Sequence, residues 1–335
     1  MPFKCEDIRV HKWGIETLDE LINIMEKGDK TSKLVERVPA IYLRKRNEYT
    51  EKTLPEWTKD KRLGFDHMNI EMLEWQNSVL KLKIPFSDYA ELVKHGYSYC
   101  WMFQAPIVDC PKMLQNMLEQ VEAHPLTQEV TLEIDKPYRS IDEMVHAAKS
   151  LNCDALVNCT GLASRKLCND KSLYPGRGVL LQYDRNCARH PSLEVPKEDG
   201  SPMRDVCVMI EDPPYASDVD PVYMIPRGNI IAIGGTYYEN DYEMHMRPQE
   251  RERLLLNASL MGIDTSRAKP IGEWVGFRPC RPTVRLDLDQ QYQSDVNDQI
   301  KVVHNYGHGG SGWTVYVGAA KAAADLLTLE KATEN

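Results

Sequence analysis

The chain has 335 residues, of which 42% are hydrophobic and 27% are charged, which is the composition of a globular protein with a sizeable core. A net charge of −9 and a pI near 5.6 argue against nucleic acid and anionic membranes as main partners. No apolar run approaches the roughly 20 residues of a transmembrane helix, and the N-terminus lacks the apolar stretch of a secretory signal. The nine cysteines show no zinc spacing, so we expect no metal site and reduced, buried thiols in an intracellular protein.

The first half of the chain predicts helices that alternate with strands. The expected elements, in order, are a helix at 15–25, a strand at 38–47, a helix at 111–121, a strand at 131–134, a helix at 141–151 and a buried strand at 154–158. Thr17 and Asp109 are candidate N-caps, and Ser140 with Glu143 forms a capping box. The helix at 111–121 has one apolar stripe, made of Met113, Leu114, Met117, Leu118 and Val121. This alternation is typical of a parallel α/β sheet.

The second half predicts mainly short strands between turns. The expected elements are strands at 180–183, 206–210, 222–225 and 229–233, a helix at 249–260, strands at 274–277 and 301–303, and a helix at 315–329. Most of this half favours an antiparallel sheet with few helices. The last strand, loop and helix return to α/β character, so the chain is expected to pass back and forth between two domains.

The segment His304–Thr314 stands between the last predicted strand and helix and is rich in glycine. Unpaired N–H groups and the positive end of a helix dipole suit such a turn to an anion or an electron-rich ring. Gly307, Gly309 and Gly312 spell G-x-G-x-x-G, but the βαβ unit and downstream acid of a dinucleotide fingerprint do not follow. A tight turn without a ligand is the alternative.

Six segments in the same order resemble the D-amino acid oxidase and D-aspartate oxidase family, a group of glutathione-reductase-like FAD oxidoreductases. The likeness is strong over residues 157–325 and loose over 13–156. The segments are Val157–Gly161, Tyr174–Gly178, Pro221–Arg227, Gly234–Tyr237, Gly276–Leu286 and His304–Ala320.

The resemblance implies a mixed α/β (α+β) fold, in which an incomplete FAD-binding, Rossmann-like domain is interleaved with an antiparallel-sheet substrate domain. The FAD-binding portions are expected at 1–37, 100–178 and 300–330. The substrate-binding portions are expected at 38–99 and 179–299.

The chain departs from the family at its start, where the family's first βαβ unit carries its Gly-x-Gly-x-x-Gly fingerprint. Up to Lys94 the glycines are Gly14, Gly28 and Gly64, at no fingerprint spacing, and Val179 replaces a family glutamine. Three interpretations stay open: a fragment of an active oxidase, a shorter product that binds FAD poorly, or a non-catalytic binding protein. Loss of a central strand predicts poor solubility or a need for a partner.

The reaction implied by the resemblance is oxidative deamination of a D-amino acid with FAD as cofactor and O2 as oxidant, giving a 2-oxo acid, ammonia and hydrogen peroxide. D-Aspartate oxidases tend to carry an arginine where this chain has Tyr237, so neutral substrates are favoured, although Arg227 leaves room for an acidic one. A glycine or sarcosine oxidase is a related alternative. A homodimer is a candidate assembly, and the location implied is peroxisomal or, without a Ser-Lys-Leu end, cytoplasmic.

The resemblance also assigns site residues. Arg278 would bind the substrate carboxylate through its guanidinium fork, with help from the Tyr223 hydroxyl. Tyr237 and Gly310 complete the expected catalytic set, although Tyr237 reads equally well as an ordinary strand tyrosine. The expected FAD contacts are Thr160, Arg285, Gly309, Gly310, Gly312, Trp313 and Thr314. Arg285 would hold the pyrophosphate, or instead pair with Asp287 or Asp289, and Tyr215 would gate a lid at 211–222.

Overall fold

The computed structural model describes residues 7–45, 54–71, 89–128, 136–185, 206–212, 222–261, 268–292 and 300–328. Its helices are α1 (Arg9–Lys27), α3 (Tyr89–Lys94), α4 (Cys110–Glu122), α5 (Ile141–Ser150), α6 (Ser164–Leu167), α7 (Pro248–Leu260) and α8 (Gly312–Thr328). Its strands are β1 (Val35–Arg44), β2 (Asp66–Asn69), β3 (Tyr99–Val108), β4 (Ala155–Asn158), β5 (Tyr174–Asp184), β6 (Cys207–Ile210), β7 (Val222–Arg227), β8 (Ile230–Gly234), β9 (Tyr238–Glu239), β10 (Gly272–Leu288) and β11 (Lys301–His308).

All of these strands belong to one mixed sheet. Its order is β2-β3-β1-β6-β7-β8-β5-β10-β11-β4, and β9 pairs with β5 off this path. The pairs β1–β6 and β4–β11 are parallel, and the others are antiparallel. The mixed α/β fold class expected from the sequence is confirmed.

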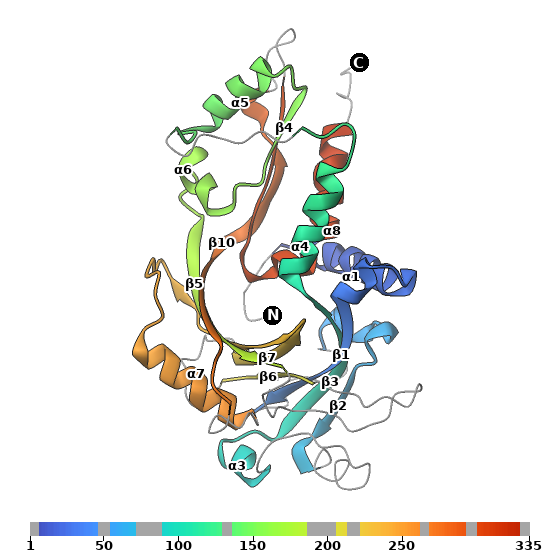
Figure 1. Ribbon diagram of the computed structural model, residues 1–335, viewed down its shortest axis with the longest axis vertical. Coiled ribbons are helices and arrows are strands. Elements are labelled where there is room, and N and C mark those ends of the chain that lie inside the picture. Colours follow the sequence, from blue (N-terminus) through green and yellow to red (C-terminus); the bar gives the residue numbers. More distant parts are fainter. Residues whose placement is uncertain are drawn as a thin grey trace.

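The long strand β10 joins the two parts of the sheet, and Figure 1 shows it running in orange between them. Its first part, Gly272–Cys280, pairs with β5. Its last part, Arg285–Leu288, pairs with β11, and the register shifts between Cys280 and Arg285. The expected domain boundaries remain a prediction. Strand β10 lies inside the expected substrate-binding portion at 179–299, and its last part pairs with β11 of the expected FAD-binding portion.

The central strands bury one face under α7. Along β7, Val222 and Met224 are buried while Tyr223 and Ile225 are half-buried, as the two-residue period of a strand requires. The buried face of β5 and β8 belongs to the largest core cluster, which includes Leu254 and Ala258 of α7. The opposite face of β7, β8, β5 and β10 carries Tyr223, Gly234, Gly178 and Arg278 and is called the site face below.

Helices α1 and α8 cross closely beside this sheet (Figure 1). A Cβ on Gly318 of α8 would lie 2.3 Å from the Cα of Trp13 in α1, so the glycine permits the approach. Thr17 is not the N-cap expected from the sequence, because α1 begins at Arg9. The Thr17 hydroxyl instead donates to the Trp13 carbonyl at 2.8 Å, in the middle of the helix.

Two of the expected helix starts have different outcomes. Ser140 caps α5 by accepting from the Glu143 N–H at 3.3 Å, as predicted, but the Glu143 carboxylate accepts from the Arg139 N–H at 2.7 Å in place of the Ser140 N–H, so only half of the expected capping box forms. The Asp109 side chain makes no cap for α4, because its carboxylate pairs with Lys112 at 2.9 Å.

The apolar stripe of α4 is only partly covered. Met113 is buried, whereas the described residues leave the side chains of Leu114, Leu118 and Val121 exposed. The strand expected at 131–134 lies outside the described residues. Within those residues, no helix combines the length and the hydropathy needed to cross a membrane.

Candidate active site

Three glycines on the site face make room for three large polar side chains. A Cβ on Gly178 would lie 2.3 Å from Nη1 of Arg278, and one on Gly176 would lie 2.6 Å from Cε2 of Tyr237. On β8, a Cβ on Gly234 would lie 2.3 Å from Cζ of Tyr223. The glycines therefore let Arg278, Tyr223 and Tyr237 lie flat across neighbouring strands.

Arg278 lies in the middle of β10 and is half-buried. Its Nη1 donates to the Thr236 carbonyl at 3.0 Å and more weakly to the Gly176 carbonyl at 3.4 Å. These contacts fix the plane of a guanidinium above Gly178. A held guanidinium is suited to bidentate binding of a carboxylate.

Tyr237 takes part in a small hydroxyl network. Its hydroxyl lies 3.2 Å from that of Tyr174 and donates to Oε1 of Glu239 at 3.1 Å. Burial, with the Tyr174 contact, raises the pKa of Tyr237, which therefore stays protonated. Sequence reasoning missed Tyr174, Glu239 and Cys280. Tyr174 and Cys280 stand two residues from Gly176 and Arg278, so the strand period could have placed them on the same face.

The glycine loop lies directly beside this cluster. It comprises the end of β11, the 3-10 turn η6 (Gly309–Ser311) and the start of α8. Gly307 and Gly309 adopt φ values of +87° and +56°, which favour glycine. A Cβ on Gly309 would lie 3.7 Å from Sγ of Cys280, two residues along β10 from Arg278. The structure thus brings together the predicted carboxylate-binding residue and the predicted flavin-binding loop.

The parallel strands β4 and β11 end beside this loop. His304 pairs in register with Asn158, the last residue of β4. Thr160 follows that strand, and its hydroxyl donates to Oδ1 of Asn158 at 2.8 Å. In α/β sheets, ligands bind beyond the carboxyl ends of parallel strands. The position of Thr160 is therefore compatible with its predicted contact to the cofactor.

The loop has polar atoms that suit a heteroaromatic ring such as flavin. Asn305 Oδ1 and His308 Nε2 are buried and have no hydrogen-bond partner among the described residues. Burial lowers the pKa of His308, so its ring is neutral. Gly310 and Thr314 are exposed. Unpaired buried polar atoms of this kind call for a ligand or an ordered water, and a flavin ring, which carries both hydrogen-bond donors and acceptors, is one such ligand.

Gly312 and Trp313 differ in what they can offer a ligand. Gly312 opens α8, and a Cβ there would meet nothing within 4 Å. The Trp313 side chain turns away into the cluster of α1 and α4, with its ring centroid 5.4 Å from that of Tyr316. The Trp313 side chain is therefore engaged by the protein, and its expected contact to FAD stays a prediction.

Arg285 is occupied by protein groups. Its Nη1 donates to the Tyr306 hydroxyl at 3.0 Å, and its Nε lies 3.3 Å from Asp287 Oδ1. The Nη2 atom lies 3.5 Å from Asp289 Oδ2. The structure therefore contains the ion pairs that were the alternative role for Arg285, and its contact to a pyrophosphate stays a prediction. Tyr215 lies outside the described residues.

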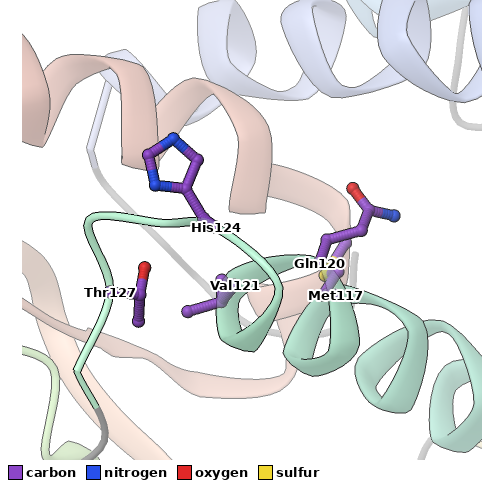
Figure 2. Close-up of a pocket in the computed structure, with 5 residues that line it drawn as sticks. All are labelled: Met117, Gln120, Val121, His124 and Thr127. Atoms are coloured by element: carbon purple, nitrogen blue, oxygen red, sulfur yellow. The ribbon is translucent and has the colours of Figure 1, made fainter.

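A surface pocket lies elsewhere, at the last turn of α4 and the segment that follows it (Figure 2). Its lining residues are Met117, Gln120, Val121, His124 and Thr127. None of the predicted site residues lines it. This pocket is therefore separate from the predicted site residues.

Known proteins resemble this chain in sequence and in fold. A D-amino-acid oxidase of Dictyostelium discoideum is 34% identical over 176 residues, covering 52% of this chain and 43% of that protein. D-aspartate oxidase 1 of Caenorhabditis elegans is 24% identical over 329 residues, covering 97% and 83%. The structure resembles glycine oxidase from Geobacillus kaustophilus with a TM-score of 0.60 at 14% identity, over 96% of this chain and 79% of that one.

The first three curated relatives are matched over only 43%, 59% and 47% of their own lengths. The family model described as DAO, FAD dependent oxidoreductase, matches residues 4–326, which is nearly the whole chain. The cofactor of that family is FAD. The chain belongs to the DAO family of FAD-dependent oxidoreductases.

Proposed function

We propose that this chain oxidises D-amino acids with neutral side chains. When bound, FAD would accept a hydride from the substrate α-carbon, and O2 would reoxidise it to release hydrogen peroxide. Water would then hydrolyse the imino acid to a 2-oxo acid and ammonia. The observation that carries the proposal is Arg278, held flat over Gly178 on the strand that also touches the glycine loop.

The chain's own residues would bind and orient the substrate. Arg278 would take the carboxylate, and Tyr223, on the same face across Gly234, would add a hydroxyl. Because Gly309 lies beside Cys280, a small amino acid held at Arg278 can extend toward the glycine loop. Orientation of this kind supplies much of the rate when the cofactor carries the hard chemistry.

The surroundings of Tyr237 support a neutral substrate. Glu239 accepts a hydrogen bond from Tyr237, so a carboxylate already lies near the cluster. A second carboxylate on an acidic side chain would be repelled there. The competing candidate is D-aspartate, because Arg227 lies on the same face of β7 as Tyr223 and its buried Nε has no partner among the described residues.

The direct test is flavin binding followed by a substrate panel. The purified chain is titrated with FAD, and peroxide is measured with D-alanine, D-aspartate and glycine, with L-alanine as the control. D-Alanine is expected to give the highest kcat/KM. If saturating FAD yields no peroxide with any D-amino acid, the chain is a non-catalytic member of the family. Higher activity on D-aspartate would move the assignment to the competing candidate, and higher activity on glycine to a glycine oxidase.

Arg278→Lys is expected to lower kcat/KM for D-alanine by roughly 100-fold, because an ammonium cannot reproduce a bidentate contact. The matched control is Arg251→Ala, whose partner Glu273 lies at 2.7 Å in an exposed pair that contributes little. FAD affinity should stay unchanged in both variants. Undiminished turnover in Arg278→Lys would remove Arg278 from the carboxylate site.

Several wider expectations remain proposals. The FAD contacts of Thr160, Gly310, Gly312 and Thr314 follow from the family resemblance and from their position at the loop. A homodimer and a peroxisomal or cytoplasmic location are implied by the resemblance alone.

A further inference from the structure

Four polar side chains form a line beneath the turn that follows β4. Asp289 Oδ2 lies 2.9 Å from His304 Nε2, and His304 Nδ1 lies 3.1 Å from Asn158 Nδ2. Asn158 Oδ1 accepts from the Thr160 N–H at 3.1 Å and from its hydroxyl at 2.8 Å. His304 and Asn158 are fully buried. The line connects the end of β10 to the Thr160 turn through β11 and β4.

The partners fix the direction of each hydrogen bond. Hydrogen bonding from His304 holds the pKa of Asp289 below its usual value although burial opposes this. Burial lowers the pKa of His304, so its ring is neutral. A carboxylate can only accept, so His304 must carry its proton on Nε2. Its Nδ1 then carries a lone pair, which lies 3.1 Å from the Asn158 amide nitrogen and 3.9 Å from the Cys168 sulfur, so the amide N–H is the nearer and stronger donor.

Orientation of the Asn158 amide follows from that lone pair. Nδ2 faces His304 at 3.1 Å, the Ser164 hydroxyl at 3.2 Å and the Cys168 sulfur at 3.3 Å, and Oδ1 faces the turn. Oδ1 is the acceptor for both donors of Thr160. Reversal of the amide would set an N–H against the Thr160 N–H and leave a buried donor unpaired. The tautomer of His304 therefore favours the amide orientation in which Oδ1 holds the turn, and the Ser164 hydroxyl adds contacts to Asn158 Oδ1 at 3.3 Å and to the Thr160 hydroxyl at 2.8 Å.

We propose that His304 is a positioning residue in a hydrogen-bonded relay from Asp289 to Thr160. The bond to Asp289 fixes the tautomer of His304, the tautomer orients the Asn158 amide, and the amide holds the Thr160–Gly161 turn in one conformation. The link to flavin rests on the proposed function, because that is what places the cofactor at Thr160. The relay itself depends only on contacts within the chain. It can therefore be tested without flavin.

Two substitutions separate the halves of the relay. Asn at position 304 places an amide oxygen near the Nδ1 position and can still accept from Asn158. Gln places its amide near Nε2, keeps the bond to Asp289 and loses the one to Asn158. If His304 served only to fill space, Gln would be the less damaging substitution, because it is larger than Asn. The relay predicts the reverse order.

The main readout is exchange of the Thr160 amide hydrogen in the full chain without FAD. His304→Gln should accelerate that exchange about tenfold or more, whereas His304→Asn should change it roughly threefold or less. His146→Gln, at an exposed position on α5, is the control and should have no effect. Equal acceleration in both His304 variants, or a larger effect of Asn, would overturn the relay.

A second readout tests the tautomer directly. In a chain with 15N-labelled histidine, the His304 ring should show a protonated Nε2 and an unprotonated Nδ1. A protonated Nδ1 would contradict the proposal. FAD titration of the same variants then tests the flavin link, with about tenfold weaker binding expected for His304→Gln. Failure of the unsubstituted chain to bind FAD would remove the proposed function but leave the exchange and tautomer results to decide the relay.

Discussion

At the scale of single residues, the site depends on glycines that face large side chains. Gly178 lies inside β5, where glycine is otherwise unfavourable, and Gly234 is the last residue of β8. Both are covered by a side chain of the predicted site, Arg278 and Tyr223 respectively. Because these glycines have no side chain, the Arg278 guanidinium and the Tyr223 ring lie directly over the backbone at these positions, which fixes their orientation across the sheet.

Gly178→Ala is expected to displace the guanidinium of Arg278, because the added Cβ would lie 2.3 Å from Nη1. KM for a D-amino acid should rise about tenfold or more, since a shift near 1 Å is costly at a positioned contact, while FAD affinity stays the same. Gly272→Ala is the matched control on β10, because its Cβ would meet the end of the flexible Gln182 side chain at 2.9 Å. An equal effect of both substitutions would exclude the specific role of Gly178.

The sequence was informative about single residues where a motif carries them. Arg278 and Tyr223 were found through the family resemblance, and the structure brings them to one face. Tyr174 and Cys280 were missed, because strand register decides that they meet Tyr237. The sequence leaves the role of Arg285 open between pyrophosphate binding and an ion pair, because only the folded structure gives its distances to Asp287 and Tyr306.

At the scale of elements, the packing of α1 on α8 supports the glycine loop. Val315 and Ala319 of α8 form a cluster with Trp13 of α1 and with Val284 and Leu286 of β10. Arg9 adds donors to two β10 carbonyls, at 2.8 Å to Val284 and 2.9 Å to Leu286. The first turn of α8 is thereby held against the strand that carries Arg278.

Gly318→Ala is expected to destabilise the chain by about 1–3 kcal/mol, because its Cβ would lie 2.3 Å from the Trp13 backbone and neither helix can move easily. Gly14→Ala in α1 is the contrasting variant. The nearest atom to its Cβ is the Thr314 carbonyl oxygen at 4.0 Å, so helix propensity should stabilise it by roughly 0.5–1 kcal/mol. Urea unfolding measures both changes, and shifts of the same sign would contradict this account.

The elements themselves were largely predictable, but their ends were not. The strand expected at 274–277 extends over Gly272–Leu288. Its apolar pattern is interrupted by Pro279, Pro282 and the arginines at 278, 281 and 285, so its length is set by pairing with β5 and then β11. Likewise, α1 starts at Arg9 because tertiary contacts to β10 extend it beyond the periodic stretch.

At the scale of the whole molecule, the sequence predicted an α/β fold but could not give the strand order. Strand β4 lies at the end of that order, and among the described residues only β11 pairs with it. Val157 on β4 is exposed, as are Leu114 and Leu118 on α4. Parallel strands and apolar stripes are normally covered. Whether such apolar side chains are buried depends on which elements pack against them in the folded chain, and a local sequence pattern does not contain that information.

One buried carboxylate ties three separate segments together and should control stability in acid. Asp170, just after α6, accepts from Arg281 of β10 at 2.9 Å and from Tyr306 of β11 at 3.0 Å. Burial alone would raise the pKa of Asp170, but hydrogen bonds from Ser172, Tyr306 and Arg281 lower it to about 2. An unfolded aspartate titrates near 3.9. The folded state therefore gains stability above about pH 4 and loses it as the pH falls toward 2.

Asp170→Asn is expected to lower the free energy of unfolding by about 2 kcal/mol at pH 7. The difference in unfolding free energy between the variant and the unsubstituted chain should narrow below about pH 4, because protonation removes the same charge from Asp170. Unfolding curves measured from pH 7 down to pH 3 give this difference at each pH. Asp325→Asn, on the exposed side of α8, is the control and should shift stability by less than about 0.5 kcal/mol. If the difference in unfolding free energy stays constant across this range, the negative charge of Asp170 does not stabilise the contact between β10 and β11, and the side chain acts through packing alone.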